Sequence, residues 1–320
     1  MRVFIAGASG VLGRRLIWQL VARGHFVVGQ VRGARAESVV RAAGGEPRHA
    51  DLFDAESLAK AADGCDTIIH AATAIPAKRK SVPSDWAMND RIRRKGTRCL
   101  TEAAAKIGAK TYLQQSVVWV ARPKDDSAFD EDSPAVPDPA IQSAVDAEAI
   151  ANEAGATDGF TVAILRGGFF YDSESAHTRM LADGLRKRQM PIIGSGDAAW
   201  AMIHTDDAAS AFVAVTEQAK NGMWHVVDNE LVTVRAFLGE FAARLGARPP
   251  RRVPTWLARW IAGEQAVVFF TRSTRTTNAR LRRDFGWTPR YPTYREGLDQ
   301  IVAAWNAESS RDAAARAVSG

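Results

Sequence analysis

The chain has 320 residues, 46% of them hydrophobic and 24% charged, which is enough for a full-sized core in one or two domains. This composition excludes an intrinsically disordered chain, a collagen and a small disulfide-stapled protein. With 42 basic and 36 acidic residues the net charge is +6, which favours an anionic ligand such as a phosphate-bearing small molecule but is too low for a dedicated nucleic-acid binder.

Short apolar runs alternate with segments of helical period through the first half of the chain, a pattern typical of a parallel sheet with helices on both faces. The apolar runs predict strands at about residues 2–6, 26–31, 46–50, 67–72, 110–116 and 160–166. The helical segments are expected near residues 11–23, 35–43, 54–62, 86–107 and 141–154. The predicted fold class is therefore α/β, a doubly wound parallel sheet of the Rossmann type.

After residue 166 the pattern changes to longer helices and isolated strands, which indicates a second region. We predict a sheet domain at residues 1–166, a smaller substrate-binding region at 167–307 interleaved with the last strands, and a fraying tail at 308–320. The segment 122–139 is rich in proline and acidic residues, so we expect an exposed loop that folds over a cleft. The aromatic stretch 256–270 is interpreted as a lid or wall for an apolar substrate, with core packing as the alternative.

The two cysteines, Cys65 and Cys99, do not form a CxxC pair, so we expect neither a structural disulfide nor a metal site. This cysteine usage fits a reducing cytoplasm, where we expect the protein to be located. No apolar run approaches the roughly 18 residues that span a bilayer, so the sequence predicts no membrane segment.

A glycine-rich turn connects the first predicted strand to the first predicted helix. It reads Gly7-Ala8-Ser9-Gly10-Val11-Leu12-Gly13 and is called the glycine turn below. Gly7 and Gly10 let the backbone turn tightly and approach a pyrophosphate, while Gly13 permits close packing of helix on strand. The helix start presents N–H groups and a positive dipole end to the phosphates. We therefore predict that Gly7, Ser9, Gly10, Val11, Leu12 and Gly13 bind a dinucleotide; a glycine-rich connection without a ligand is the alternative.

The end of the second strand indicates which dinucleotide is bound. Sites for NAD usually place an Asp or Glu about 20 residues after the glycines, where it holds the ribose 2′-hydroxyl. Here that position reads Gln30-Val31-Arg32-Gly33, followed by Arg35. No carboxylate repels a 2′-phosphate, and two guanidinium groups can pair with it. The sequence therefore predicts NADP in preference to NAD, unless Arg32 and Arg35 are simply solvated.

Further motifs follow the glycine turn along the chain. Asp51-Leu52 comes after the third strand, Ala71-Ala72-Thr73 ends the fourth, and Gly168-Phe169 follows Leu165-Arg166 at the end of the sixth. With the glycine turn, they resemble the extended and atypical short-chain dehydrogenase/reductase superfamily, the NAD(P)-dependent epimerase/dehydratase group, from residue 1 to about 305. The resemblance implies adenine contacts for Asp51 and Leu52, ribose contacts for Ala71, Ala72 and Thr73, and backbone near the nicotinamide carboxamide at Gly168 and Phe169.

The sequence departs from this family at the residues that transfer protons. The family normally uses a YxxxK pair, in which the Lys lowers the pKa of the Tyr phenol so that it exchanges a proton with a substrate oxygen. The four tyrosines, Tyr112, Tyr171, Tyr291 and Tyr294, are followed four residues later by Ser116, Ser175, Arg295 and Leu298. An alignment on Ser143 and Glu148 puts Ala140 and Ala144 at the Tyr and Lys positions, and Arg93 replaces the family's Asn.

Two hydroxyl groups remain as candidate catalytic residues. Ser116 ends the fifth strand, where the family carries its substrate-polarising Ser, and Tyr171 follows the sixth strand. The alternatives are a hydroxyl bonded to local backbone and an ordinary strand-end aromatic. Trp119 is interpreted as a cleft wall and His204 as a residue that orients the following turn, with a general base as the alternative. The loop can also bring in an acid such as Asp130 or Glu131.

The main hypothesis is an NADP-dependent oxidoreductase that acts on a small, apolar carbonyl or hydroxyl compound with a non-standard proton donor. A catalytically silent NADP-binding sensor or scaffold is one alternative, and a redox-neutral isomerase or lyase on the same fold is another. We expect a small-molecule substrate, no nucleic acid, no membrane partner and no metal, and a monomer or homodimer.

Overall fold

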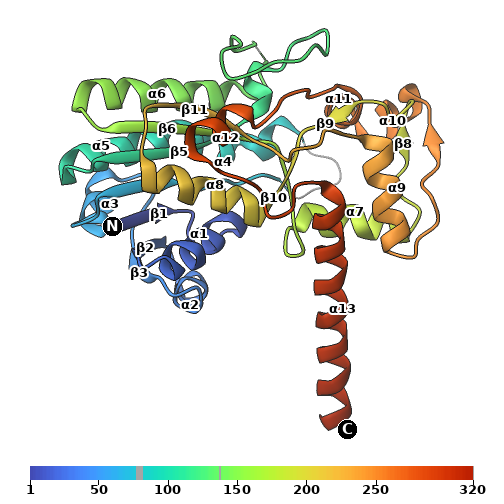
Figure 1. The fold of residues 1–320 in the computed structure, drawn as a ribbon, viewed down its shortest axis with the longest axis horizontal. Helices are drawn as coiled ribbons and strands as arrows, with labels where there is room; N and C mark the ends of the chain where they lie inside the picture. The colour runs from blue at the N-terminus through green and yellow to red at the C-terminus, as the bar shows by residue number, and fades with distance from the viewer. Residues whose placement is uncertain (77–81, 137, 320) are drawn as a thin grey trace.

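A seven-stranded parallel sheet forms the centre of the computed structural model, which describes residues 1–76, 82–136 and 138–319 (Figure 1). The strands are β1 (Arg2–Ala6), β2 (Phe26–Val31), β3 (Glu46–His49), β4 (Thr67–His70), β5 (Thr111–Val117), β6 (Thr161–Gly167) and β11 (Gly222–Val226). Their order is β11-β6-β5-β4-β1-β2-β3, and all neighbours run parallel. The sheet grows from β1 in both directions, so the predicted doubly wound fold is confirmed.

The six predicted strands are all present, and their ends lie within two residues of the predicted ones. The seventh strand, β11, was not predicted. It is a short run that pairs in parallel with β6, from Gly222 opposite Ala163 to Val226 opposite Gly167. The sheet therefore includes a segment from beyond residue 166. Without β11, the edge of β6 would leave backbone N–H and C=O groups unpaired, and β11 forms hydrogen bonds with them.

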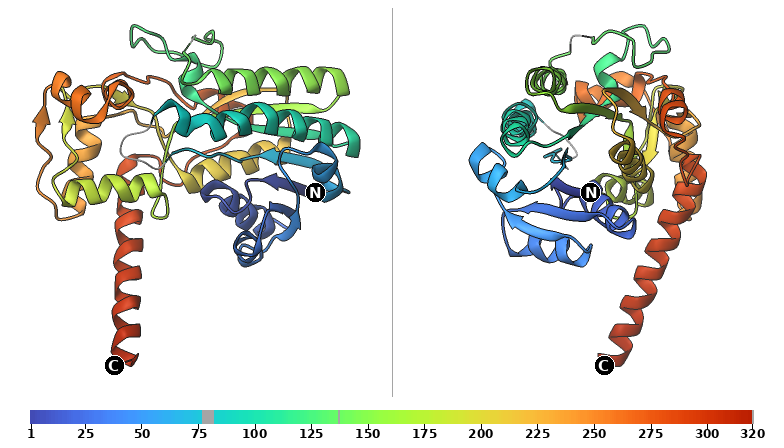
Figure 2. Two further views of the ribbon diagram at one scale, coloured as in Figure 1. Left: turned by 180° about the vertical axis from the view of Figure 1, so that it is seen from behind. Right: turned by 60° about the vertical axis from the view of Figure 1, so that its left-hand side comes forward.

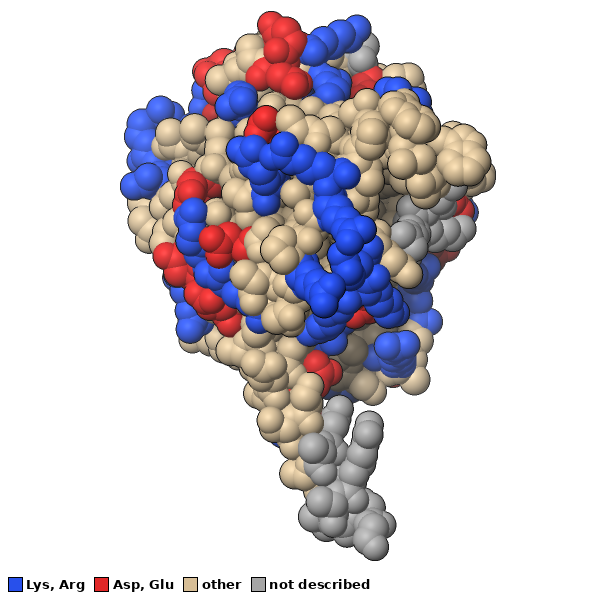
Figure 3. All heavy atoms as spheres, turned by 90° about the vertical axis from the view of Figure 1, so that its right-hand side faces the viewer, with Lys and Arg blue, Asp and Glu red and all other residues tan. Residues whose placement is uncertain are grey.

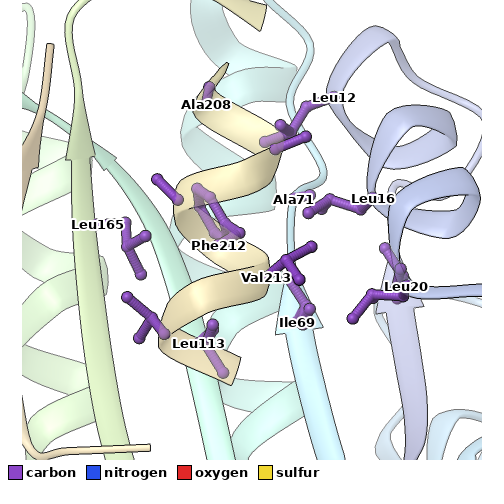
Figure 4. Close-up of a cluster of buried hydrophobic side chains, with 14 of the residues drawn as sticks. Leu12, Leu16, Leu20, Ile69, Ala71, Leu113, Leu165, Ala208, Phe212 and Val213 are labelled. Atoms are coloured by element: carbon purple, nitrogen blue, oxygen red, sulfur yellow. The ribbon is translucent and has the colours of Figure 1, made fainter. Parts of the chain in front are cut away.

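Helices cover both faces of the sheet (Figure 2). One face carries α1 (Val11–Ala22), α2 (Ala34–Ala42), α8 (Thr205–Gln218) and α12 (Ala279–Phe285), and the other carries α3 (Ala55–Ala62), α5 (Thr97–Ile107) and α6 (Gln142–Asp158). Leu12, Leu16 and Leu20 recur every four residues along α1, which places them on one buried face. Figure 4 shows this leucine row beside Phe212 and Val213 of α8 over the sheet.

The long helix expected near residues 86–107 is divided into four segments. These are the 3₁₀ turn η1 (Pro83–Trp86), α4 (Ala87–Arg91), the π-helical turn η2 (Ile92–Gly96) and α5. A π turn inserts an extra residue into the helical ladder and is frequent at functional sites. Here it carries Arg93, whose side chain is buried.

The residues after β6 build a second core beside the carboxyl ends of the strands. Its strands are β7 (Phe169–Tyr171), β8 (Ile192–Ile193), β9 (Ala199–Trp200), β10 (Met202–His204), β12 (Val232–Thr233) and β13 (Arg252–Val253), and its helices are α7 (Ala176–Arg186), α9 (Val234–Arg244), α10 (Thr255–Ala262) and α11 (Glu264–Thr271). Trp200, Phe237, Phe241 and Trp305 lie in this core. In the stretch 256–270, Phe269 and Phe270 pack against Trp200, whereas Trp256 and Trp260 are exposed.

The last helix, α13 (Tyr294–Ser319), leaves the body of the molecule (Figure 1). Its first turns bury Tyr294, Leu298, Ile301 and Trp305 in the second core. The segment expected to fray from residue 308 continues the same helix to Ser319. Its alanines give it a high intrinsic helix propensity, although it projects away from the packed region.

The predicted loop begins after the 3₁₀ turn η3 (Val118–Ala121). Its described residues, 122–136 and 138–139, form no helix or strand, and residue 137 lies outside the described residues. Among the contacts that fix the loop are the buried Phe129, whose N donates to Arg275 O at 3.0 Å, and a backbone hydrogen bond from Val136 N to Val120 O. It lies above the start of α6 in Figure 2, at the end of the sheet where the candidate site is found.

Lysine and arginine side chains gather in a band on the end of the molecule that carries the second core (Figure 3). The exposed basic residues at this end include Arg186, Lys187, Arg188, Arg248, Arg251 and Arg252, which lie around the paired strands β8 and β13. Within the part of the chain that the structure describes, no helix meets the length and apolarity that crossing a membrane requires.

Candidate functional site

The glycine turn is shaped so that only glycine fits at two of its positions. Gly7 has φ +84°, and a Cβ atom there would lie 2.5 Å from Ala72 N; a Cβ on Gly13 would lie 2.2 Å from Gly7 O. At Gly10 a Cβ would meet only Gly7 O, at 3.1 Å, so this side of the turn is open. The turn thus packs against the segment that follows β4 on its inner side and presents bare backbone on its outer side.

The start of α1 fits the phosphates of a dinucleotide. Gly10 is the N-cap of the helix, has no side chain to bond the first N–H groups, and no acidic residue lies in the first turn. These N–H groups and the helix dipole are therefore free to act on an anion. Leu12 is buried in the core, so it can contribute only its backbone, while Ser9 and Val11 are partly exposed.

The predicted ribose and adenine positions lie along the same edge of the sheet. Ala71 N donates to Ala6 O at 2.9 Å, which holds the segment Ala71–Thr73 against the glycine turn. Beyond β3, the Asp51 carboxylate accepts from Phe53 N at 3.0 Å, and Leu52 is buried. Gly168 and Phe169 follow β6, and Phe169 N donates to Ala201 O at 2.8 Å.

Arg32 and Arg35 lie where the sequence analysis expects the 2′-phosphate. Arg32 follows β2, Arg35 lies in the first turn of α2, and both are exposed. Neither guanidinium forms an ion pair with any described residue. The acid nearby on α2, Glu37, pairs with Arg41 at 3.5 Å and with His49 at 3.8 Å. The two arginines are thus available to an anionic ligand.

Ser116 belongs to a buried charged cluster. Its Oγ donates to Glu148 Oε1 at 2.5 Å, and Arg166 donates to both carboxylate oxygens of Glu148, at 2.8 Å from Nε and 2.6 Å from Nη2. Ser116 and Arg166 are register partners on β5 and β6, and Glu148 reaches them from α6. The hydroxyl proton of Ser116 is engaged by the carboxylate, so Ser116 can donate to a substrate only if this bond is broken, whereas its oxygen remains an acceptor.

A second cluster surrounds the positions aligned with the family's Tyr and Lys. Arg93 donates to Ser143 Oγ at 3.4 Å, and Ser143 Oγ donates to Asp90 Oδ1 at 2.6 Å. Burial lowers the pKa of the Arg93 guanidinium, while Asp90 and Glu148 act to raise it. Ala144, the next residue after Ser143, is buried, and Ala140 is exposed before α6 begins. The guanidinium of Arg93 therefore reaches this part of α6 from the π turn. The sequence indicated only that Arg93 replaces the family's Asn.

Tyr171 does not lie beside Ser116. Its side chain is fully buried in the second core, its hydroxyl donates to Asp228 Oδ2 at 2.9 Å, and its ring packs against His204 and Phe237. Burial raises the pKa of this phenol well above its ordinary value. The pairing of β7 with β10 sets Tyr171 opposite His204, and the side chain of Tyr171 packs in the second core. This geometry supports a structural role for Tyr171, and we do not retain it as a proton donor.

Other residues singled out in the sequence are also engaged. His204 caps α8 by accepting from Asp206 N at 3.2 Å, as expected for a residue that orients the turn. Glu131 of the loop accepts from His225 N at 2.9 Å. Trp119 lines a cavity of about 200 Å³ at the base of the loop, which agrees with its interpretation as a wall.

Asp228, the partner of Tyr171, leads to a prediction about pH. Burial raises the pKa of Asp228 to about 8, and Asp207 and Glu296 act in the same direction. Between about pH 5 and 7 the folded protein holds a proton that the unfolded chain has lost, so stability falls as pH rises, by about 1.4 kcal/mol per pH unit from this group. Asp228→Asn is expected to remove this contribution to the slope, measured by urea unfolding at pH 5, 6 and 7. The exposed Asp183→Asn serves as control, and an unchanged slope in Asp228→Asn would contradict the prediction.

Comparison with known proteins places this site in a family. The model of the NAD dependent epimerase/dehydratase family matches residues 3–226. A 3-diazoavenalumate denitrifying reductase from a Streptomyces species is 34% identical over 306 residues, covering 93% of this chain and 99% of that protein. A ketoreductase from Stigmatella aurantiaca, acting on 4-hydroxy-2-methyl-3-oxo-4-farnesyl-3,4-dihydroquinoline-1-oxide, is 27% identical, covering 95% and 96%.

Solved structures agree on the fold. A UDP-glucose 4-epimerase from Thermotoga maritima, solved with UDP-glucose, superposes with a TM-score of 0.80 at 16% identity, covering 96% of this chain and 99% of that one. A human epimerase family protein solved with NADPH gives a TM-score of 0.79 at 21% identity, covering 95% and 99%. These relatives indicate a nicotinamide cofactor and a reaction of the reductase or epimerase type. The chain belongs to the NAD-dependent epimerase/dehydratase family.

Proposed function

We propose that the protein is an NADPH-dependent reductase that delivers hydride to a small electrophile without a Tyr–Lys pair. The observation that carries this proposal is the combination of an open glycine turn with alanine at both positions aligned with that pair, Ala140 and Ala144. When bound, the nicotinamide supplies the hydride. The glycine turn would hold the pyrophosphate and the backbone at Gly168 and Phe169 would face the nicotinamide amide.

The substrate class is inferred from the lack of a tyrosine that could donate a proton to the product. Reduction of a carbonyl requires a proton for the developing alkoxide, and the family normally takes it from the tyrosine. A diazonium group needs no added proton: the carbon that bears it accepts the hydride, the carbon–nitrogen bond breaks with its electron pair leaving on N₂, and the new carbon–hydrogen bond remains. The most similar relative described above is a denitrifying reductase of a diazo compound. We therefore propose a diazonium substrate, with carbonyl reduction as the second candidate on the evidence of the ketoreductase.

The protein groups near the proposed reacting centre suit this chemistry. Ser116 presents an acceptor oxygen backed by Glu148, which can stabilise a positively charged diazonium group before transfer. The hydroxyl is held in place because Glu148 is fixed by two bonds from Arg166. Ser116 would then position the electrophile, and Ser116→Ala should weaken substrate binding more than NADPH binding.

Isotope transfer tests the proposal. NADPH deuterated at nicotinamide C4 is incubated with the protein and benzenediazonium, and the background without protein is subtracted. We expect one equivalent of N₂ per NADPH and benzene carrying one deuterium. Deuterium recovered only in alcohols from added aldehydes would support carbonyl reduction instead. NADPH binding without any turnover would support the sensor or scaffold alternative, and turnover with no net NADPH consumption would support the redox-neutral one.

The preference for NADPH is a separate prediction. If Arg32 and Arg35 pair with the 2′-phosphate, the double variant Arg32→Ser/Arg35→Ser should bind NADPH about 10- to 100-fold more weakly, as expected for one to two charge-assisted bonds, and NADH unchanged. Arg41→Ser removes an exposed cation from the last turn of the same helix and should leave both affinities unchanged. Calorimetric titration with both cofactors measures this, and tighter binding of NADH by the unmodified protein would contradict it.

A further inference from the structure

A basic cavity lies at the base of the loop, next to the proposed reaction site. It has a volume of about 200 Å³ and is lined by Trp119, Arg122, Lys124, Val136, Asp138, Pro139 and Arg272. Three cationic side chains thus face one carboxylate. A second carboxylate, Asp126, lies 3.6 Å from Arg272 outside the lining, so the surroundings keep a net positive charge even when it is counted.

Arg122 contributes a guanidinium group to the lining of this cavity. The residue is 8% exposed, its guanidinium forms no hydrogen bond or ion pair with any residue that the structure describes, and it opens onto the cavity. Arg272, by contrast, donates to Pro123 O, and Lys124 is exposed. Burial, together with Arg272, lowers the pKa of Arg122, whereas Asp138 and Asp126 act to raise it. A guanidinium that faces a cavity without a carboxylate bound to it can pair with an anion that enters the cavity.

Aromatic side chains connect the cavity to the cofactor end of the site. The Trp119 ring lies 6.3 Å from the Phe269 ring, and the Phe269 ring lies 5.4 Å from the Phe169 ring, measured between centroids. Phe169 is one of the residues expected beside the nicotinamide. Pro139, which lines the cavity, directly precedes Ala140, where our alignment puts the family's tyrosine. A flat apolar group can therefore lie along these rings between the cavity and the site of hydride transfer.

We propose that this cavity binds the carboxylate of an aromatic acid, held by Arg122 and Arg272 with Lys124 at the mouth, while the ring lies against Trp119 and Phe269. Guanidinium groups match the geometry of a carboxylate, and aromatic side chains match the face of a ring. The inference rests on the proposed function, which it deepens: the substrate would be an aryl carboxylate whose reducible group is remote from the acid.

The test measures binding and needs no turnover. The full-length protein, saturated with NADPH, is titrated calorimetrically with 4-hydroxycinnamate and with its neutral analogue 4-hydroxycinnamamide. We expect the acid to bind at least about 10-fold more tightly than the amide, as for one charge-assisted pair, and this preference to decrease with added salt. In Arg122→Gln the preference should fall to about 3-fold or less. Arg282→Gln, an exposed arginine of α12, is the matched control and should keep it.

Several outcomes would overturn the inference. The first is equal affinity for the acid and the amide. The second is a preference for the acid that remains in both Arg122→Gln and Arg272→Gln. The third is displacement of the acid by inorganic phosphate at equal concentration, which would indicate an unspecific anion site. If Arg122→Gln does not fold, Lys124→Gln at the exposed mouth and Arg272→Gln carry the test. Failure of the reductase proposal appears differently, as acid binding without hydride transfer. Hydride transfer to neutral substrates with no preference for acids would defeat this inference alone.

Discussion

Replacing Glu148 by alanine is expected to lower the free energy of unfolding by about 3–5 kcal/mol, because it removes one partner of a buried ion pair and leaves the other charge uncompensated. Arg166 donates two bonds to Glu148, and the side chains are only 5% and 7% exposed. Ser116 loses its acceptor in the same substitution. Urea unfolding at constant pH without cofactor measures the effect.

Two further variants separate a lost ion pair from a lost side chain. Glu153→Ala removes an exposed acid from the same helix and should change stability by no more than about 0.5 kcal/mol. The double variant Glu148→Met/Arg166→Met replaces both charges by apolar groups and should recover much of the loss. If Glu148→Ala were no less stable than Glu153→Ala, the cluster would not be a buried ion pair in solution, and the positioning role proposed for Ser116 would lose its basis.

The second large effect is expected at Gly7. In Gly7→Ala the new Cβ would lie 2.5 Å from Ala72 N, and the residue must also keep φ +84°. Because the segment at Ala71 is held by the hydrogen bond from Ala71 N to Ala6 O directly after β4, we expect the glycine turn to shift instead. We expect NADPH to bind at least about 100-fold more weakly, since a displaced turn loses several phosphate contacts at once.

Gly24→Ala is the matched control for backbone strain. Gly24 has nearly the same φ, +82°, but a Cβ there meets nothing within 4 Å. This variant should lose about 1 kcal/mol of stability from strain alone and bind NADPH normally. Calorimetry with NADPH and urea unfolding on both variants provide the comparison. Equal NADPH affinity in Gly7→Ala and the unmodified protein would show that the glycine turn does not hold the cofactor.

The two clusters on α6 show how a site can be altered while its scaffold remains. We propose that alanines take the positions of the family's tyrosine and lysine, as our alignment has them, while Ser143 and Glu148 are present and engaged. Arg93 brings a guanidinium toward Ser143 from the π turn. If hydride transfer to a diazonium group is the reaction, the site needs a held electrophile and a dry pocket rather than a titrating phenol.

The sequence by itself determined six of the seven strands of the central sheet, the glycine turn and the fold class. These depend on neighbours in the chain: short apolar runs, glycine at a turn, and leucines four residues apart in α1. Tertiary structure decided what depends on distant partners. It added β11 to the edge of β6, set Ser116 on Glu148 32 residues away, and brought Arg272 beside the loop that holds Arg122. It also placed Tyr171 in the second core, where its side chain is fully buried. Local sequence patterns determine the secondary structure. The hydrogen-bond partners and protonation state of a side chain depend on residues that are distant in the chain and pack around it.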